Sequence, residues 1–438
     1  MPGPRMAAVW GRRRVGKTAL VEHFAERRWT VFHTGSSRPV ADELSALAGA
    51  AAAQGIAAPG FEPAAFRDWP EALSSLAAAS TNEPLLLVLD ELPELLATSP
   101  ELLSVLRAFW DRLGESSKLR LLLCGSAVRV MESMREERAP LYGRIDLSLL
   151  LHPFRPHEAG EMLGGLSPAD RALVWGIVGG VPLYLRWWDV GRTIADNLSD
   201  LACQPGARLL TEGQLVLATE GDGGDLARQV LYALGSGRTR HNEIADAVRA
   251  DPTRTLERLV ELRLVERVVP VTEDPRRTRR RIYRIADNFL AFWLGMLSRH
   301  AAEIERGLGR GILAVLLQGL DEHMGPRYEE AFRAHLRRMA GEGRIGEAVV
   351  AVGPFWRAGD PPDEIDAVVL AGREREAVLV GEAKWARRVD GAAIVRELQR
   401  KSSSLPSLRA GARFAVCARE AVDGPVDLAV TAEDIFGG

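Results

Sequence analysis

The sequence predicts an α/β protein that opens with a parallel sheet and closes with a second, smaller α/β domain. Short apolar runs rich in Val, Leu and Ile alternate with helical patterns over residues 1–150, which is typical of a parallel sheet covered on both faces. A mixed pattern of this kind returns after about Gly319. The 438 residues are enough for about three domains. A content of 47% hydrophobic and 26% charged residues is typical of a globular protein.

Each predicted strand of the first sheet is a run of strand length. The runs are Met6–Trp10, Trp29–His33, Leu85–Leu89, Leu119–Cys124 and Ile145–Leu150, and the clearest helices between them are Ala41–Gln54 and Pro100–Leu113. Residues 155–222 contain no convincing strand, so we expect a helical lid there, broken at Gly179-Gly180-Val181-Pro182. The longest apolar run, Pro84–Leu89, is far too short to span a membrane. We therefore expect a cytoplasmic protein without membrane contact.

The charge balance excludes a globally basic surface. There are 56 basic and 59 acidic residues, a formal net charge of −3, so any nucleic-acid surface must be local. The basic residues comprise 52 arginines and only four lysines, Lys17, Lys118, Lys384 and Lys401. In such an arginine-rich chain, a lysine is expected where a compact ammonium group is needed. The three cysteines are far apart in the sequence, which argues against a disulfide framework or a cysteine zinc site.

A phosphate-binding loop follows the first strand. Residues Gly11-Arg12-Arg13-Arg14-Val15-Gly16-Lys17-Thr18 match G-x-x-x-x-G-K-[ST], and a helical pattern starts at Ala19. Backbone N–H groups of such a loop, up to Ala19, surround the phosphates at a helix N-terminus. Lys17 is expected to reach the β- and γ-phosphates, and the Thr18 hydroxyl to coordinate Mg²⁺. The alternative is a glycine-rich turn without a ligand.

Polar residues at the ends of other strands are candidate partners of this loop. Asp90 and Glu91 end an apolar strand, where Asp90 is expected to hold Mg²⁺ and Glu91 to polarise the attacking water. Ser126 follows the next strand and is placed to contact the γ-phosphate or the water. Arg144 is a candidate for stabilising the developing charge. The alternative for the strand-end residues is that they are simply solvated. The alternative for Arg144 is an ordinary surface role.

These motifs together resemble the archaeal-type P-loop ATPases, which are signal-transduction ATPases related to AAA+ proteins. The resemblance covers nearly the whole chain. It rests on residues 9–18, Leu89-Asp90-Glu91, Cys124-Gly125-Ser126, Leu141-Tyr142-Gly143-Arg144 and the stretch 179–185, in this order. It implies a P-loop ATPase core over residues 1–153, a helical lid over residues 154–222, ATP as the nucleotide, and assembly into homo-oligomers.

Residues 223–300 have the pattern of a winged helix. Two helical patterns, His241–Arg249 and Pro252–Arg263, have helix-turn-helix spacing, and Val265–Val271 and Arg279–Ile285 then form a hairpin. The hairpin tip carries five arginines that could follow a DNA backbone while the helix 252–263 enters the major groove. They are Arg276, Arg277, Arg279, Arg280 and Arg281. The alternative is a winged helix that serves only as a spacer. Gly221–Gly224 is the best linker before this segment, and a second boundary is expected between Gly307 and Asp321.

The last segment, residues 319–438, contains a set of charged residues on an α-β-β-β-α-β pattern. A helix over Met324–Arg338 carries Glu329, and Asp366 lies in one strand of a hairpin. Glu382 and Lys384 are two apart on the next strand and therefore project from the same face. A helix over about Gly391–Lys401 and a strand over Arg413–Cys417 complete the order.

This arrangement resembles the D…ExK core of restriction-endonuclease-like, PD-(D/E)XK, domains. The resemblance implies that Asp366 and Glu382 bind Mg²⁺, with the Ala383 carbonyl as a further ligand, and that Lys384 orients or deprotonates a water. Glu329 would complete the acidic cluster, although its neighbour Glu330 is an alternative. Exposed strand-end charges are the structural alternative for the whole set.

Two functions of different classes follow. The first is ATP hydrolysis coupled to a DNA-binding, Mg²⁺-dependent nuclease. The second is an ATPase switch or scaffold in signalling, whose C-terminal domain binds nucleic acid or protein without cutting.

Overall fold

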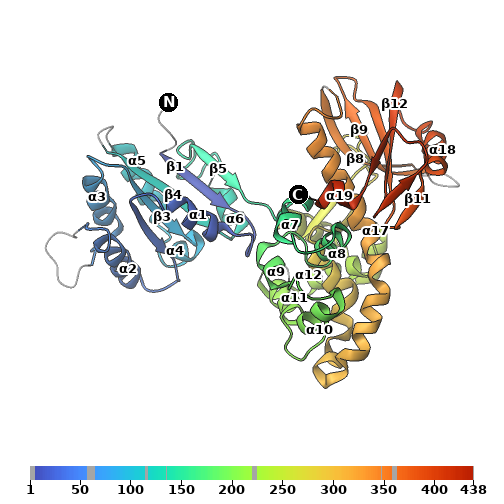
Figure 1. Cartoon of the computed structure of the whole chain (residues 1–438). Helices are drawn as coiled ribbons and strands as arrows, with labels where there is room; N and C mark the ends of the chain where they lie inside the picture. Colours follow the sequence, from blue (N-terminus) through green and yellow to red (C-terminus); the bar gives the residue numbers. More distant parts are fainter. Residues whose placement is uncertain are drawn as a thin grey trace. The chain divides into compact units, whose positions relative to one another are not determined.

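The computed structural model describes residues 5–56, 65–113, 117–134, 136–219, 224–346, 348–357 and 363–437. The chain divides into two compact units, Met1–Pro153 and Phe154–Gly438 (Figure 1). Each unit has its own sheet and its own hydrophobic core. The linker expected at residues 221–224 lies outside the described residues except for Gly224.

The first unit contains a five-stranded parallel sheet in the order β2-β3-β4-β1-β5. Its strands are β1 Met6–Trp10, β2 Thr30–Thr34, β3 Leu85–Asp90, β4 Leu119–Gly125 and β5 Leu147–Leu150. This confirms the predicted α/β class and its parallel sheet. Because every connection is a crossover, all five strands end at one edge, and the loops after β1, β3 and β4 meet there.

Helices enclose two cores on the sheet of the first unit. They are α1 Lys17–Ala25, α2 Val40–Ala52, α3 Trp69–Ala79, α4 Leu92–Thr98, α5 Leu102–Arg112 and α6 Val128–Ser133. Successive side chains of β1 point to opposite faces of the sheet. Met6, Ala8 and Trp10 therefore pack in the larger core on one face, and Val9 packs in the smaller core on the other. Val21 of α1 is buried in the smaller core.

The second unit begins with helices. They are α7 Pro156–Met162, α8 Pro168–Val178, α9 Pro182–Trp187, α10 Ile194–Ala202, α11 Arg208–Thr219, α12 Gly224–Gly235, α13 His241–Val248 and α14 Thr253–Glu261. Prolines occupy the first turns of α7, α8 and α9, where the missing N–H is no loss. Residues 154–219 contain helices and no strand, as expected for the predicted lid.

A short antiparallel hairpin follows α14. Its strands are β6 Val265–Val268 and β7 Ile282–Ile285, both shorter than predicted. Pro270 cannot continue the strand ladder, and the N–H of Val271 donates instead to the carbonyl of Pro354. The helix, turn, helix and two-strand order agrees with the prediction, and the assignment as a winged helix stays a prediction.

A single helix replaces the second boundary that we expected between Gly307 and Asp321. After α15 Asn288–Phe292, α16 Ala301–Glu303 and short 3-10 and π turns, α17 runs from Gly309 to Gly341. Buried residues recur at helical spacing through this stretch, which explains why the helix continues. They include Leu316, Leu320, Met324, Tyr328, Phe332, Leu336 and Met339. The predicted helix Met324–Arg338 is the second half of α17.

The C-terminal part is a mixed sheet in the order β14-β12-β10-β9-β8. The elements are β8 Val349–Arg357, β9 Asp363–Ala371, β10 Glu376–Ala383, β11 Arg388–Asp390, α18 Gly391–Ser402, β12 Leu408–Cys417, β13 Ala421–Asp423, β14 Leu428–Val430 and α19 Ala432–Phe436. Strand β9 is antiparallel to both of its neighbours, whereas β10 and β12 are parallel. Helix α17 contacts α8, α10 and the strands β8, β9 and β10 of this sheet (Figure 1).

No helix in the described parts of the chain is both long enough and apolar enough to cross a membrane.

Candidate functional site

The loop between β1 and α1 has the backbone that its glycines require. Gly16 caps α1 with a φ of 89°, in the left-handed region. Gly11 has a φ of 152°, and a Cβ there would lie 2.3 Å from the carbonyl oxygen of Leu151. Arg14 also has a positive φ, of 68°. The loop therefore curls tightly at the end of β1 instead of continuing the strand.

Lys17 and Thr18 point into the same region as Asp90. The Lys17 side chain is buried, and its Nζ donates to the carbonyl of Arg12 at 2.9 Å. The Thr18 hydroxyl donates to Oδ2 of Asp90 at 2.9 Å. Two segments 72 residues apart in the sequence are thus joined at the edge where the strands end.

The donor chemistry at Asp90 fits a magnesium ion. Asp90 is 1% exposed, and its Oδ1 has no hydrogen-bond partner among the residues that the structure describes. A buried carboxylate oxygen without a hydrogen-bond partner costs free energy. Together with the Thr18 hydroxyl, this oxygen is the kind of ligand that a hard cation such as Mg²⁺ prefers. Burial and then the Asp90 carboxylate raise the pKa of the neighbouring Cys124 thiol, which keeps that thiol neutral.

Glu91 is held by the residue that follows β4. Ser126 Oγ donates to Oε2 of Glu91 at 2.7 Å. Glu91 has a φ of 48°, a left-handed conformation that costs energy in a non-glycine residue and recurs at functional sites. Arg144 does not join this group in the structure. It forms a bidentate pair with Asp111 on α5, at 2.7 and 2.8 Å.

The loop after β2 was not predicted as part of this site. Glu43 is fully buried, and its carboxylate accepts from His33 at 2.9 Å and from the N–H groups of Ser36 and Arg38. The N–H of Gly35 donates to the carbonyl of Asp90 at 2.9 Å, so this loop lies beside the end of β3. The signal was weak in the sequence, because a lone Glu on a helix is normally a solvated residue.

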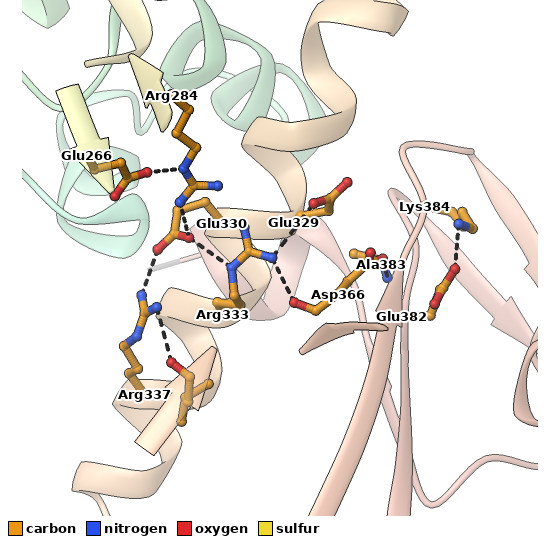
Figure 2. Close-up of polar contacts among 11 residues, drawn as sticks. Glu266, Arg284, Glu329, Glu330, Arg333, Arg337, Asp366, Glu382, Ala383 and Lys384 are labelled. Atoms are coloured by element: carbon orange, nitrogen blue, oxygen red, sulfur yellow. Dashed lines mark hydrogen bonds and ion pairs between the residues drawn. The ribbon is translucent and has the colours of Figure 1, made fainter. Parts of the chain in front are cut away.

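The predicted acid cluster lies on β9, β10 and α17. Asp366 and Glu382 are each 8% exposed. Asp366 Oδ2 accepts from the N–H of Ala383 at 2.8 Å, and Lys384 Nζ lies 2.7 Å from Oε1 of Glu382 (Figure 2). Lys401 of α18, which the motif did not include, also contacts Glu382, at 3.3 and 3.4 Å.

Arg333 contacts both neighbouring glutamates of α17, and Glu330 more closely. This arginine is 1% exposed and donates to Oε2 of Glu330 and to the backbone carbonyl of Asp366 (Figure 2). Glu330 also pairs with Arg284 of β7 and with Arg337. Burial would raise the pKa of Glu330, but its three arginines outweigh burial and hold that pKa well below the usual range.

Glu329 is the member of the pair whose charge acts on Asp366. Burial raises the pKa of Glu329. Burial, then Glu329 and then Glu382, raise the pKa of Asp366 to about 7. This is the behaviour of carboxylates that repel one another at close range. The Glu329 carboxylate also lies 3.7 Å from Arg333.

The acid cluster does not form a metal cage in this arrangement. In the described ranges, no group of three or more His, Cys, Asp or Glu side chains is placed to hold a metal ion. The Asp366 carboxylate accepts from a backbone N–H, and Glu382 is engaged by two lysines. As the side chains lie, Asp366 and Glu382 thus have protein partners, which each carboxylate would exchange in order to hold Mg²⁺.

The predicted basic tip is exposed, but its arginines differ. Arg276, Arg277, Arg279, Arg280 and Arg281 are all exposed. Arg280 forms an ion pair with Glu273 and donates to the carbonyl of Trp356, whereas Arg277 is 3.7 Å from Asp274. The tip is thus fastened to β8, and part of its charge is compensated within the protein.

Comparisons with known proteins identify the first unit. Residues 3–187 match the model of an ATPase domain found predominantly in Archaea. Residues 293–396 match a family described as archaeal and bacterial proteins of unknown function. The chain is therefore similar to an archaeal-type ATPase domain over residues 3–187 and to that second family over residues 293–396.

Individual relatives span most of the chain. An uncharacterized protein of Methanocaldococcus jannaschii is 25% identical over 403 residues, which cover 90% of this chain and 86% of that protein. The solved Walker-type ATPase of Pyrococcus abyssi is 21% identical, with a TM-score of 0.48, covering 67% of this chain and 91% of that one. The ORC2 protein of Aeropyrum pernix is 15% identical, with a TM-score of 0.41, covering 71% and 89%.

Proposed function

We propose that the first unit binds and hydrolyses ATP with Mg²⁺. The observation that carries this is the contact of Thr18 with Asp90, beside the buried Lys17, at the end of a parallel sheet. Thr18 and Asp90 would hold the magnesium ion, which supplies charge neutralisation at the phosphates. Lys17 would bind the β- and γ-phosphates, leaving the carbonyl of Arg12.

The remaining residues of this site act on the attacking water. Glu91 orients it and accepts its proton, and Ser126 holds the Glu91 carboxylate in position. Arg144 pairs with Asp111 in this structure, and it leaves that partner to stabilise the charge that develops on the phosphate. Self-association is a further prediction, which light scattering with and without ATP tests.

Replacement of Lys17 by Ala tests the nucleotide site. We expect Lys17→Ala to lose ATP hydrolysis by at least about a hundredfold, because no other ammonium group can neutralise the transferred phosphoryl group. Phosphate release measures the turnover, and circular dichroism checks the fold. Lys118→Ala, which removes an exposed lysine of the same unit, is the matched control. Retained turnover in folded Lys17→Ala would refute the site.

For the second unit we propose a DNA-binding winged helix joined to a metal-dependent, PD-(D/E)XK-like nuclease domain controlled by the ATPase. The supporting observation is that Asp366 and Glu382 lie buried on the adjacent strands β9 and β10. Burial, and then repulsion from Glu329 and Glu382, raises the pKa of Asp366. A bound divalent ion would offset that repulsion. Lys384, beside Glu382, is the residue expected to act on the water.

A second candidate is an ATPase switch whose C-terminal domain binds nucleic acid or protein without cutting. Two observations favour it. Glu382 is already neutralised by Lys384 and Lys401, and the described carboxylates do not form a metal-ligand group.

A cleavage assay separates the two candidates. Supercoiled, linear and single-stranded DNA are incubated with Mg²⁺ or Mn²⁺, with and without ATP. Nuclease function predicts cutting that Asp366→Ala and Lys384→Ala each reduce at least about a hundredfold, because metal and proton chemistry supply most of the rate. Absence of cutting in a preparation that still hydrolyses ATP would contradict nuclease function and favour the second candidate.

A further inference from the structure

Lys401 has no assigned role in the proposed nuclease reaction. The chain has four lysines among 56 basic residues. Lys17 lies in the phosphate loop and Lys384 beside Glu382, whereas Lys118 is exposed and donates to the carbonyl of Asn82. Lys401 is the remaining one, and the fold brings it to the acid cluster from a different element.

The position of Lys401 is well defined. It lies in the last turn of α18, and its Nζ is 3.4 Å from Oε1 and 3.3 Å from Oε2 of Glu382, 19 residues away. The end of this helix is fastened to the start of β9, because Asp363 accepts from Arg400 at 3.1 Å and from Ser404. Packing and ion pairing therefore hold the ammonium group against the carboxylate.

The two lysines on Glu382 differ in exposure. The Lys384 side chain is 49% exposed, and the Lys401 side chain is 15% exposed. The Glu382 side chain is only 10% exposed, so its charge needs a partner at all times. If Lys384 leaves to contact a ligand, Lys401 remains to neutralise the carboxylate. With Lys401 absent, Lys384 would have to stay.

We infer that Lys401 is a positioning residue: it neutralises and fixes Glu382, which releases the exposed Lys384 to bind a phosphate oxygen of a nucleic-acid backbone. The assignment of the ligand rests on the proposed function. The different roles of Lys401, which holds Glu382, and Lys384, which can leave it, rest on the contacts and exposures alone.

Lysine labelling tests the release of Lys384 without any cleavage. Reductive methylation followed by mass spectrometry gives the modification rate of each lysine, with Lys118 as internal standard. In wild type we expect Lys384 to react faster than Lys401. In Lys401→Met and Lys401→Gln we expect the Lys384 rate to fall roughly tenfold, since Lys384 becomes the sole partner of a buried carboxylate. Lys401→Arg should stay within about twofold of wild type, because the charge is retained.

The direction in which the Lys384 labelling rate changes distinguishes a positioning role of Lys401 from local unfolding. Local unfolding would expose Lys384 and raise its rate, whereas loss of Lys401 as a partner lowers it. Arg396→Met removes an exposed cation from the same helix and should leave the rate unchanged. An unchanged or faster Lys384 rate in both Lys401→Met and Lys401→Gln would overturn the inference.

The cleavage arm links Lys401 to the reaction. If wild type cuts DNA, Lys401→Met should lower kcat at least about tenfold with KM within about twofold, and Lys401→Arg should restore most of kcat, because Lys401 acts through Glu382 and not on the substrate. Equal losses in kcat with Lys401→Met and Lys401→Arg would contradict positioning by charge. If wild type does not cut, the nuclease proposal fails, and the labelling result still decides the role of Lys401.

Discussion

Glycine at position 11 is required by a contact from outside its own loop. The N–H of Leu151 donates to the carbonyl of Trp10 at 2.7 Å, which brings the chain after β5 against the start of the phosphate loop. A Cβ on Gly11 would then lie 2.3 Å from the Leu151 carbonyl oxygen. The conformation of one residue thus depends on a strand more than 130 residues away.

Replacement of Gly11 by Ala should therefore destabilise the first unit. We expect a loss of about 2–4 kcal/mol, because backbone has to move and the φ is unfavourable for alanine. Gly49→Ala is the control. Gly49 lies within α2 with no atom near its Cβ position, so alanine should stabilise by about 0.5–1 kcal/mol. Urea denaturation measures both, and equal effects of the two substitutions would contradict this account.

At the scale of elements, the hairpin β6–β7 is connected to the acid cluster by charged side chains. Arg284 of β7 pairs with Glu266 of β6 and with Glu330 of α17 (Figure 2). Glu330 accepts from Arg333, which donates to the backbone of Asp366. A series of hydrogen bonds and ion pairs therefore connects the hairpin to β9.

The basic tip of this hairpin is the predicted DNA contact. Replacing Arg276, Arg279 and Arg281 by Ala should weaken DNA binding and reduce the slope of log K against log salt by roughly one per arginine that contacts a phosphate. Arg280→Ala should have a smaller effect, because Arg280 is already paired with Glu273. Fluorescence anisotropy across salt concentrations measures the slope. An unchanged slope in the triple variant would exclude the tip as the contact.

At the scale of the whole molecule, the second unit has one main core that runs from the first helices to the C-terminal end. Phe436 packs against Trp175 of α8, and Arg171 donates to the Phe436 carbonyl at 3.0 Å. His323 of α17 bonds to the carbonyl of Gly176 at 2.9 Å. The helices after Pro153, α17 and the C-terminal sheet therefore belong to one packed body.

His323 should make this body sensitive to acid. Burial, and then the charge of Arg327, lower its pKa to about 3, so the folded state binds fewer protons than the unfolded state below about pH 6.5. Its contribution to stability is present above pH 6.5 and decreases by about 1.4 kcal/mol per pH unit as the pH falls toward 3. Urea unfolding at pH 7 and pH 5 should show a smaller difference in His323→Gln than in wild type. His300→Gln is the control, and equal pH dependence in both variants would contradict the role of His323.

The sequence by itself determined the parts of the candidate sites that consist of residues close together in the chain. The phosphate loop is eight contiguous residues between a strand and a helix, and the strand ending in Asp90 and Glu91 is recognisable by its apolar run. Short-range patterns of this kind predict the sheet of the first unit and the order of elements around Asp366, Glu382 and Lys384, because backbone geometry alone sets which side chains share a face.

Tertiary structure decided every pairing between distant segments. It paired Arg144 with Asp111, surrounded Glu330 with three arginines, and brought Lys401 to Glu382. It also continued α17 through an expected boundary. The physical reason is that a charged side chain is equally compatible with solvent and with a buried partner. Only the packing of helices on sheets determines which partner comes within hydrogen-bond distance.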